Sequence, residues 1–315
     1  MALIAIADHV KLNGPGISRW MIDVVNRHVY RAQMADTKIQ WASKVWNPNG
    51  QRWTGEWRFV PERLAEPLMW RKPCRIFVDP IRDLFDEAFT NEQIAAVFGV
   101  MAASPQHIFQ VLTKRPKRMR EWFEWIAEQA GTTNNGGAWC INHVDDQHPD
   151  VSPADRVYLG VPWPLPNVHL GVSVEDQDAA NSRIADLLST PAVVHWLNCE
   201  PLLGPLDLAC LNDGSWYDRE GATCYDALRG HAYYRDGEHG LSGGPRVSWV
   251  VVGCESGRGA RPADAAWFHS IAEQCTEAET PLFVKQIMVD GELCHDAHRF
   301  PPGLQRQEFP VAEQR

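Results

Sequence analysis

Six charged side chains stand at the ends of short apolar runs, and side chains of these types could carry out chemistry. They are Asp79, Lys114, Glu175, Glu200, Glu255 and Lys285. If the runs are parallel strands, their carboxyl ends meet at one edge of the sheet, so we expect these side chains to open into one cavity. Carboxylates beside cations suit a small charged ligand with groups of both signs, such as an amino acid or a nucleotide derivative. Any single one of these residues could instead have a structural role, because it could pair with another of them or cap the next helix.

The same residues allow a second hypothesis, a metal-dependent hydrolase or lyase. Glu175, Glu200 and Glu255 would bind a divalent metal through their carboxylate oxygens. Lys114 or Lys285 would then act as the acid or as an electrostatic stabiliser. Metal analysis would separate this hypothesis from the binding of a small ligand.

The segment GCESGRGARP, Gly253 to Pro262, is the most informative short stretch of the chain. A glycine after a buried strand lets backbone N–H groups approach a phosphate or a carboxylate closely, and an arginine adds a charged donor. The segment matches neither the P-loop nor the dinucleotide-binding fingerprint, and a tight turn of small residues is the alternative. The candidate ligand-binding residues here are Gly253, Glu255, Ser256, Gly257 and Arg261.

The eight cysteines do not form a metal-binding motif. They are spread along the chain without any C-x-x-C spacing, so reduced thiols are expected. Cys199 and Cys254 each precede a glutamate at a strand end, and both are expected to act as small buried hydrophobes. Cys140, His143 and His148 form a C-x2-H-x4-H pattern, but no second ligand pair stands nearby, so no metal is expected there.

The order of apolar and amphipathic segments predicts an α/β fold. Short apolar runs alternate with helical periodicity from residue 74 onward, as in βαβ units around a parallel sheet. Six such units predict a partial (β/α)6-type barrel with two loop insertions, at Gly131 to Pro166 and Asn212 to Arg246. The strands are expected at Arg75 to Asp79, Ile108 to Thr113, Val168 to Glu175, Val193 to Asn198, Trp249 to Gly253 and Pro281 to Gln286.

Helix starts are visible between these runs. Thr90 and Gln93 have capping-box spacing, Pro116 suits a first helical turn, and Asp264 precedes apolar residues at helical spacing. The stretch Ile17 to Gln33 places its apolar residues on one helical face, so a further helix is expected near the amino terminus.

Composition and charge narrow the functional classes. The 315 residues are 44% hydrophobic and 22% charged, as in a globular protein, and no apolar run approaches the roughly 20 residues of a membrane span, so a soluble cytoplasmic chain is expected. A net charge of −10 argues against sequence-independent nucleic-acid binding. A third hypothesis, a nucleic-acid-processing accessory protein, rests on a basic cluster that also fits the solvated face of a helix. This cluster comprises Lys114, Arg115, Lys117, Arg118 and Arg120.

Several long motifs resemble one known family. They are RIFVDPIRDLFDE, SPQHIFQVLTKRPKRM, WPLPNVHLGVSVEDQDAANSRIADLL, NCEPLLGPLDL, VVVGCESGRGARP and PLFVKQ, in this order. They resemble the phage-associated gp-thirty-seven/gp-sixty-eight family of unknown function, over about residues 36 to 286. That family is regarded as radical-SAM-like, a partial barrel in which three cysteines hold a [4Fe–4S] cluster. The resemblance implies a site at the strand ends, with S-adenosylmethionine as the small ligand.

The three cysteines of that family are missing here. The stretch MADTKIQWASKVWNP resembles the family's opening, but Pro48 runs directly into NGQRWTGEWRFVPERLAEPLMW, without the cysteine-rich loop and helix that should come between. Reductive cleavage of S-adenosylmethionine then has no electron source, so the cluster is predicted to be absent. Three explanations remain open: a degenerate or repurposed binding protein, a cluster on scattered residues such as Cys199 and Cys254, or a replaced amino terminus.

The expected organisation is an extension with one helix over residues 1–33, a partial barrel over 34–290 and a tail over 291–315. Either the helix of the extension fills the place of the lost helix, or Met34 is the native start. The leading hypothesis is a barrel that binds a small charged ligand or acts with a protein partner. It would not associate with membranes, and would bind nucleic acid only with a partner.

Overall fold

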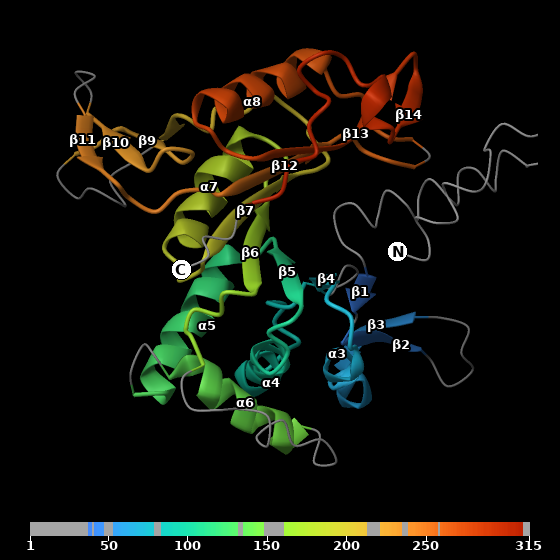
Figure 1. Ribbon diagram of the computed structural model, residues 1–315, viewed down its shortest axis with the longest axis vertical. Helices are drawn as coiled ribbons and strands as arrows, with labels where there is room; N and C mark the ends of the chain where they lie inside the picture. Colours follow the sequence, from blue (N-terminus) through green and yellow to red (C-terminus); the bar gives the residue numbers. More distant parts are fainter. Residues whose placement is uncertain are drawn as a thin grey trace, which may run out of the picture.

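The computed structural model describes residues 37–39, 41–46, 53–78, 83–131, 135–147, 161–212, 221–234, 239–257 and 259–310. Its main sheet has eight strands in the order β1-β4-β5-β6-β7-β12-β13-β14, and neighbouring strands are parallel except β13 and β14 (Figure 1). The strand bounds are Thr37–Ile39 (β1), Arg75–Val78 (β4), Ile108–Thr113 (β5), Val168–Ser173 (β6), Val194–Cys199 (β7), Trp249–Gly253 (β12), Leu282–Val289 (β13) and Glu292–Cys294 (β14). The six predicted strands are therefore confirmed, with small differences at their ends.

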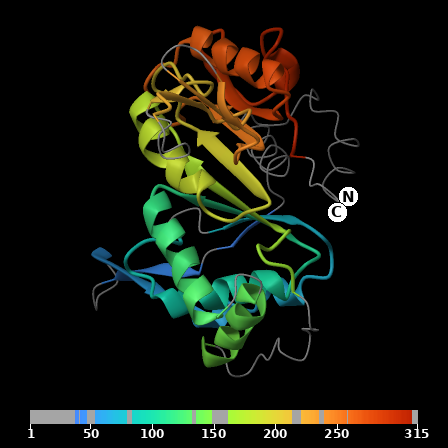
Figure 2. The ribbon, with the colours of Figure 1, turned by 90° about the vertical axis from the view of Figure 1, so that its left-hand side faces the viewer.

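The parallel strands follow one another in space in the order in which they occur in the chain. Right-handed crossovers without a reversal of strand order place all the connecting helices on one face of the sheet. They are α4 (Asn91–Ala102), α5 (Pro116–Gln129), α7 (Gln177–Leu188) and α8 (Ala265–Glu277). Figure 2 shows α5 (green) and α7 (yellow-green) on the left of the strands and α8 (orange-red) above them. No pairing joins β1 to β13 or β14 in the described residues, so the sheet is open there and is not a closed barrel.

Both faces of the sheet are covered by apolar side chains. Val168, Leu170 and Val172 alternate toward the helices and belong to the larger buried core. Trp196 and Trp249 belong to a second buried cluster on the opposite face, together with Phe283. We call this opposite face, defined by Trp196, Trp249 and Phe283, the inner face.

The predicted helix starts are confirmed. The Thr90 hydroxyl accepts from the Gln93 N–H at 3.2 Å, and the Gln93 side chain accepts from the Thr90 N–H at 3.1 Å, which is a capping box. Pro116 opens α5, and the Asp264 carboxylate caps α8 by accepting from the Ala266 N–H at 2.9 Å. The predicted helix from Ile17 to Gln33 lies outside the described residues.

The first insertion contains a helix, which sequence periodicity did not predict. This helix, α6 (Gly136–Gln147), packs on α4 through its buried residues Cys140 and Val144. The close approach depends on Gly99 of α4, because a Cβ there would lie 2.3 Å from the Cys140 carbonyl oxygen. Cys140 is thus a helix-packing residue, and the His143 Nδ1 pairs with the Trp139 carbonyl at 3.1 Å.

The second insertion forms a small antiparallel sheet of its own. Its strands are β8 (Leu211–Asn212), β9 (Cys224–Asp226), β10 (His231–Tyr233) and β11 (His239–Ser242), in the order β11-β10-β9-β8. A disulfide joins Cys210 to Cys224, so the expectation of reduced thiols is wrong for these two residues. Cys210 directly precedes β8 and Cys224 opens β9, and their Cα atoms are 5.1 Å apart, within the range that a disulfide needs.

The remaining elements lie at the two edges of the main sheet. A hairpin of β2 (Ala42–Trp46) and β3 (Trp53–Phe59) leads into the short helices η1 (Pro61–Arg63) and α3 (Glu66–Met69). After β14 and η4 (Ala297–Arg299), the chain returns to β13, where the Val284 N–H donates to the Arg306 carbonyl at 2.8 Å. None of the described helices is long and apolar enough to cross a membrane.

Candidate functional site

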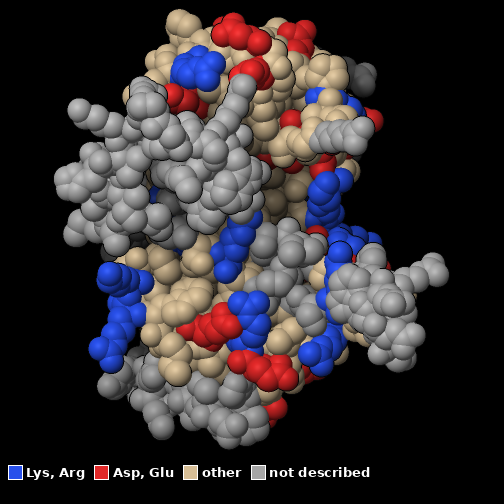
Figure 3. Space-filling view, turned by 90° about the vertical axis from the view of Figure 1, so that its right-hand side faces the viewer, with Lys and Arg blue, Asp and Glu red and all other residues tan. Residues whose placement is uncertain are grey.

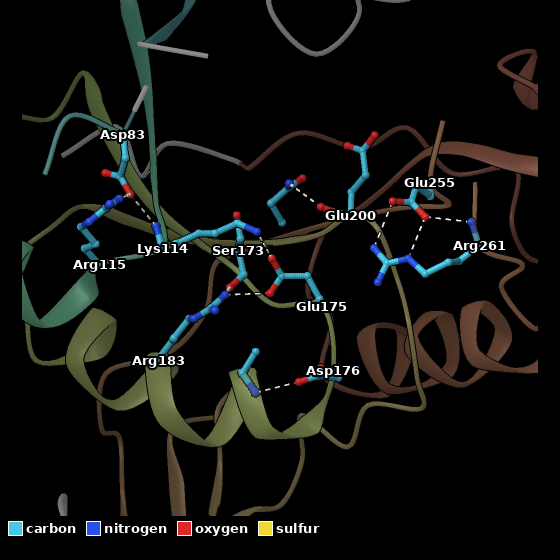
Figure 4. Close-up of polar contacts among 12 residues, drawn as sticks. Asp83, Lys114, Arg115, Ser173, Glu175, Asp176, Arg183, Glu200, Glu255 and Arg261 are labelled. Atoms are coloured by element: carbon cyan, nitrogen blue, oxygen red, sulfur yellow. Dashed lines mark hydrogen bonds and ion pairs between the residues drawn. The ribbon is translucent and has the colours of Figure 1, made fainter. Parts of the chain in front are cut away.

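The register of the parallel strands brings several of the predicted residues to one edge of the sheet. Ser173 of β6 is aligned with Asn198 of β7, and Asn198 with Val251 of β12. Two residues further on, this register places Glu175, Glu200 and Gly253 side by side at the ends of three neighbouring strands. We call this edge, with Lys114 after β5 and Lys285 in β13, the rim. Figure 4 shows Lys114, Glu175 and Glu200 at this edge.

Two cations from different elements hold Glu175. Its Oε1 accepts from the Lys114 ammonium, and its Oε2 accepts from Arg183 Nη1 of α7 at 2.7 Å. Arg183 also donates to the Ser173 carbonyl at 2.7 Å, which fixes the guanidinium beside the end of β6. Burial raises the pKa of Glu175, but the two cations outweigh burial, so the pKa lies below its usual value and the carboxylate stays ionised.

A second ion pair crosses the rim between Glu200 and Lys285. The Lys285 ammonium donates to Glu200 Oε2, and Gln286 Nε2 donates to Glu200 Oε1 at 2.9 Å. Gln286 also donates to the Cys254 carbonyl at 2.8 Å, so the amide is anchored to the end of β12. The side chains of Glu200 and Lys285 are only 15% and 23% exposed, so this pair is largely shielded from water.

Glu255 pairs within its own loop. Its carboxylate accepts from Arg261 Nε at 2.8 Å, from Nη2 at 3.0 Å and from the backbone N–H at 2.8 Å (Figure 4). These hydrogen bonds lower the pKa of Glu255 to about 2. Gly257 has a φ of +109°, which favours glycine, and Ser256 beside it is exposed. The contacts of Glu255 thus tie the loop to Arg261, and Ser256 and Gly257 lie exposed in this loop.

The rim therefore brings together Lys114, Glu175, Glu200 and Lys285, with the Glu255 loop beside them. Asp79 lies outside the described residues. Asp83, a few residues later, accepts from the Lys114 N–H at 2.8 Å and from the Thr113 hydroxyl at 2.9 Å, so its role is to cap the end of β5.

Sequence reasoning missed Arg183 and Gln286. Arg183 lies seven residues after the helix cap Asp176, a spacing of two helical turns that keeps both residues on the side of α7 near the strand ends. Gln286 follows Lys285 directly, but a register shift between Val252 and Gly253 turns its amide toward the rim as well. A bulge of this kind leaves no clear mark in the sequence.

The basic cluster after β5 makes intramolecular contacts. Arg115 pairs with Asp86 at 2.7 Å, Arg120 with Asp186 at 2.8 Å, and Lys117 with Glu121 at 3.9 Å. On α5 itself, Lys117 pairs with Glu121 and Arg120 with Glu124 one turn later, which is typical of a solvated helix face. Figure 3 shows the same mixture on the face that it draws, where Lys and Arg side chains lie beside Asp and Glu.

The cysteines of the chain do not fit a cluster held by three thiolates. All eight lie within the described residues, two of them form the disulfide, and the other six form no disulfide. No group of three His, Cys, Asp or Glu side chains in the described ranges could hold a metal ion. Cys199 and Cys254 are buried, as predicted, and burial raises the pKa of both thiols, to about 11 for Cys254. A thiolate is therefore disfavoured at both positions.

Comparison with known proteins places the chain in one family. Residues 27–299 match the model of a protein of unknown function (DUF5131), and this range includes the whole main sheet and the rim. No curated protein and no solved structure matches the chain. The chain is therefore a member of the DUF5131 family.

Proposed function

We propose that the rim binds a small ligand that carries both a cationic and an anionic group. The supporting observation is that two ion pairs, Lys114–Glu175 and Lys285–Glu200, meet on one edge of the sheet. Their four residues come from four different strands or strand ends. Charged side chains that converge from separate strands at one edge of a sheet are typical of a ligand-binding site, so this convergence supports a ligand. An anionic group of the ligand would take Lys114, whose side chain is 58% exposed, and a cationic group would approach Glu200.

We further propose that the open sheet is a partial barrel of the radical-SAM type. Phe77 of β4 and Trp196 of β7 are three strands apart, which is about 14 Å across a flat sheet. Their ring centroids are 6.5 Å apart on the inner face. Likewise, Arg75 of β4 lies 3.9 Å from the ring of Phe309, whose centroid is 5.8 Å from that of Trp249 in β12. These contacts support a strongly curved sheet.

In this proposal the ligand is S-adenosylmethionine or a related metabolite, bound without a [4Fe–4S] cluster. S-adenosylmethionine carries an amino acid group with both charges, which suits the charge pattern of the rim. The absence of three converging cysteines leaves binding, not reductive cleavage, as the function that these residues support.

The alternatives have less support. A hydrolase would need the rim carboxylates as metal ligands, and no group of three His, Cys, Asp or Glu side chains in the described residues could hold a metal ion. A nucleic-acid-binding role would rest on the cluster after β5, in which Arg115, Lys117 and Arg120 pair with carboxylates of the protein itself, so the cluster carries little net positive charge.

Isothermal titration calorimetry with S-adenosylmethionine tests the proposal. We expect weak binding by the wild type and a loss of heat for Lys285→Met, Glu255→Ala and Gly257→Val, because each change alters the rim or its neighbouring loop. Lys117→Met is the matched control, since Lys117 lies on α5 and pairs only with Glu121 among the contacts described above. Equal heats from the wild type and all three rim variants would remove the rim from the binding site.

A further inference from the structure

A buried histidine on the inner face has no hydrogen-bond partner in the described structure. His169 of β6 is 4% exposed, and neither its Nδ1 nor its Nε2 has a partner there. It faces the inner side of the sheet, because Val168 and Leu170 on either side of it belong to the helix-facing core. Buried side-chain nitrogens are almost always hydrogen-bonded in folded proteins, so this imidazole needs an explanation.

The neighbours of His169 on the adjacent strands include one polar side chain. Its register partners are Gln110 on β5 and Val194 on β7. Above it, Gly171 has no side chain, and the Trp196 ring fills that space, with Trp196 Nε1 donating to the His169 carbonyl at 3.3 Å. The indole thus separates His169 from the rim, so any occupant beside this ring differs from the ligand proposed above.

The chemistry of the ring defines the occupant. Burial lowers the pKa of His169 to about 4, so the ring is neutral at physiological pH and offers one N–H donor and one nitrogen acceptor. No group of three potential metal ligands exists in the described ranges, which argues against a metal ion beside the ring. A small neutral guest that hydrogen-bonds one of the two ring nitrogens suits this ring.

We propose that the inner face holds a buried water molecule that is hydrogen-bonded to His169 and is part of the folded structure. Water is the smallest molecule that can accept a hydrogen bond from the ring N–H, and buried waters in proteins bind groups of this kind. The molecule itself provides a control, His195 on the neighbouring strand, which is 8% exposed and whose Nε2 pairs with the Thr190 carbonyl at 2.7 Å.

Nuclear magnetic resonance of the full chain with ¹⁵N-labelled histidine tests this site. We expect the ring N–H of His169 to show a cross-peak to a long-lived water, and the ring N–H of His195 to show none. His169→Leu should lower the melting temperature by a few degrees, because it removes the hydrogen bonds to the water. A ring without a water cross-peak, or a His169→Leu variant with a raised melting temperature, would overturn the proposal. The spectrum of the wild type decides even where the variant does not fold.

Discussion

Lys285 of β13 and Glu200 at the end of β7 form an ion pair across β12, the strand that lies between theirs. The carboxylate can reach across because the residue in the middle is Gly253. A Cβ at Gly253 would lie 3.4 Å from both Cγ and Cδ of Glu200, at the limit of ordinary contact. The glycine of the predicted ligand loop thus also makes room for the ion pair of the rim.

The effect of a substitution at Gly253 on stability should depend on the size of the new side chain. We expect Gly253→Ala to keep the ion pair and the stability of the wild type, because its methyl group only touches Glu200. Gly253→Val adds two methyl groups against the same carboxylate and should destabilise the protein by about 1–3 kcal/mol. Thermal and urea unfolding of the three proteins measures the difference. Equal stabilities for the valine and alanine variants would show that the Glu200 side chain can adopt another conformation that avoids the valine.

Removal of the Lys285 cation should destabilise the fold through Glu200. Lys285→Met leaves a largely buried carboxylate with only the Gln286 amide, and we expect a loss of about 1–3 kcal/mol. The double variant with Glu200→Gln should recover part of this loss, because no uncompensated charge remains. Urea unfolding of the two single variants and the double variant gives the coupling energy. Additive effects would contradict a direct interaction. Lys117→Met serves as the control for loss of an exposed lysine.

The stability of the protein should fall as the pH falls from 7 to 5, in part through His169. Its pKa is lowered by burial to about 4, so the unfolded chain binds a proton in this range and the folded chain does not. The group then accounts for about 2 kcal/mol of stability that is present above pH 6.5 and is lost toward pH 5. We expect His169→Leu to show a shallower dependence over this range in urea unfolding. Glu175 contributes to the pH dependence of stability only below about pH 4.5, because the usual pKa of a glutamate lies near that value and the pKa of Glu175 is lowered further. A variant with the slope of the wild type between pH 5 and 7 would rule out this role for His169.

Anaerobic reconstitution with iron and sulfide should leave the protein colourless. The six cysteines outside the disulfide are spread over the fold, and no group of three potential ligands is found among the described residues, so a cluster has no set of three thiolates to bind. Iron and sulfide analysis after removal of unbound metal is expected to give substoichiometric values. A brown protein with stoichiometric iron would reverse the conclusion that these cysteines do not fit a cluster.

The sequence predicted the regular part of the fold because its apolar residues follow the periods of strands and helices. In α5, the four residues Met119, Trp122, Phe123 and Ile126 recur at helical spacing, and all four are buried. The insertions were harder to predict. The burial of α6 depends on the contact with Gly99, far away in sequence, and β8 to β11 have only two to four residues each, too few for a period to be visible.

The candidate site, like the fold, was only partly predictable from the sequence. The charged residues at the strand ends could be found in the sequence, since each stands at the boundary of an apolar run. Their partners could not, because the choice between Lys114 and Lys285 for each glutamate depends on strand order. The small residue at Gly253 decides whether Glu200 can reach across β12.

The edge of β13 is covered by residues that follow it in the chain. β14 pairs with residues 287–289, and residues 306–308 bond to residues 282–284. A ribosome therefore makes every parallel strand before it makes the segments that protect the last one. Until Glu308 emerges, the nascent chain presents a bare strand edge to neighbouring polypeptides, and unpaired edges of this kind promote aggregation. Translation that stops between β13 and Glu308 would release a product with a nearly complete sheet and an open edge, which we expect quality-control proteases to remove.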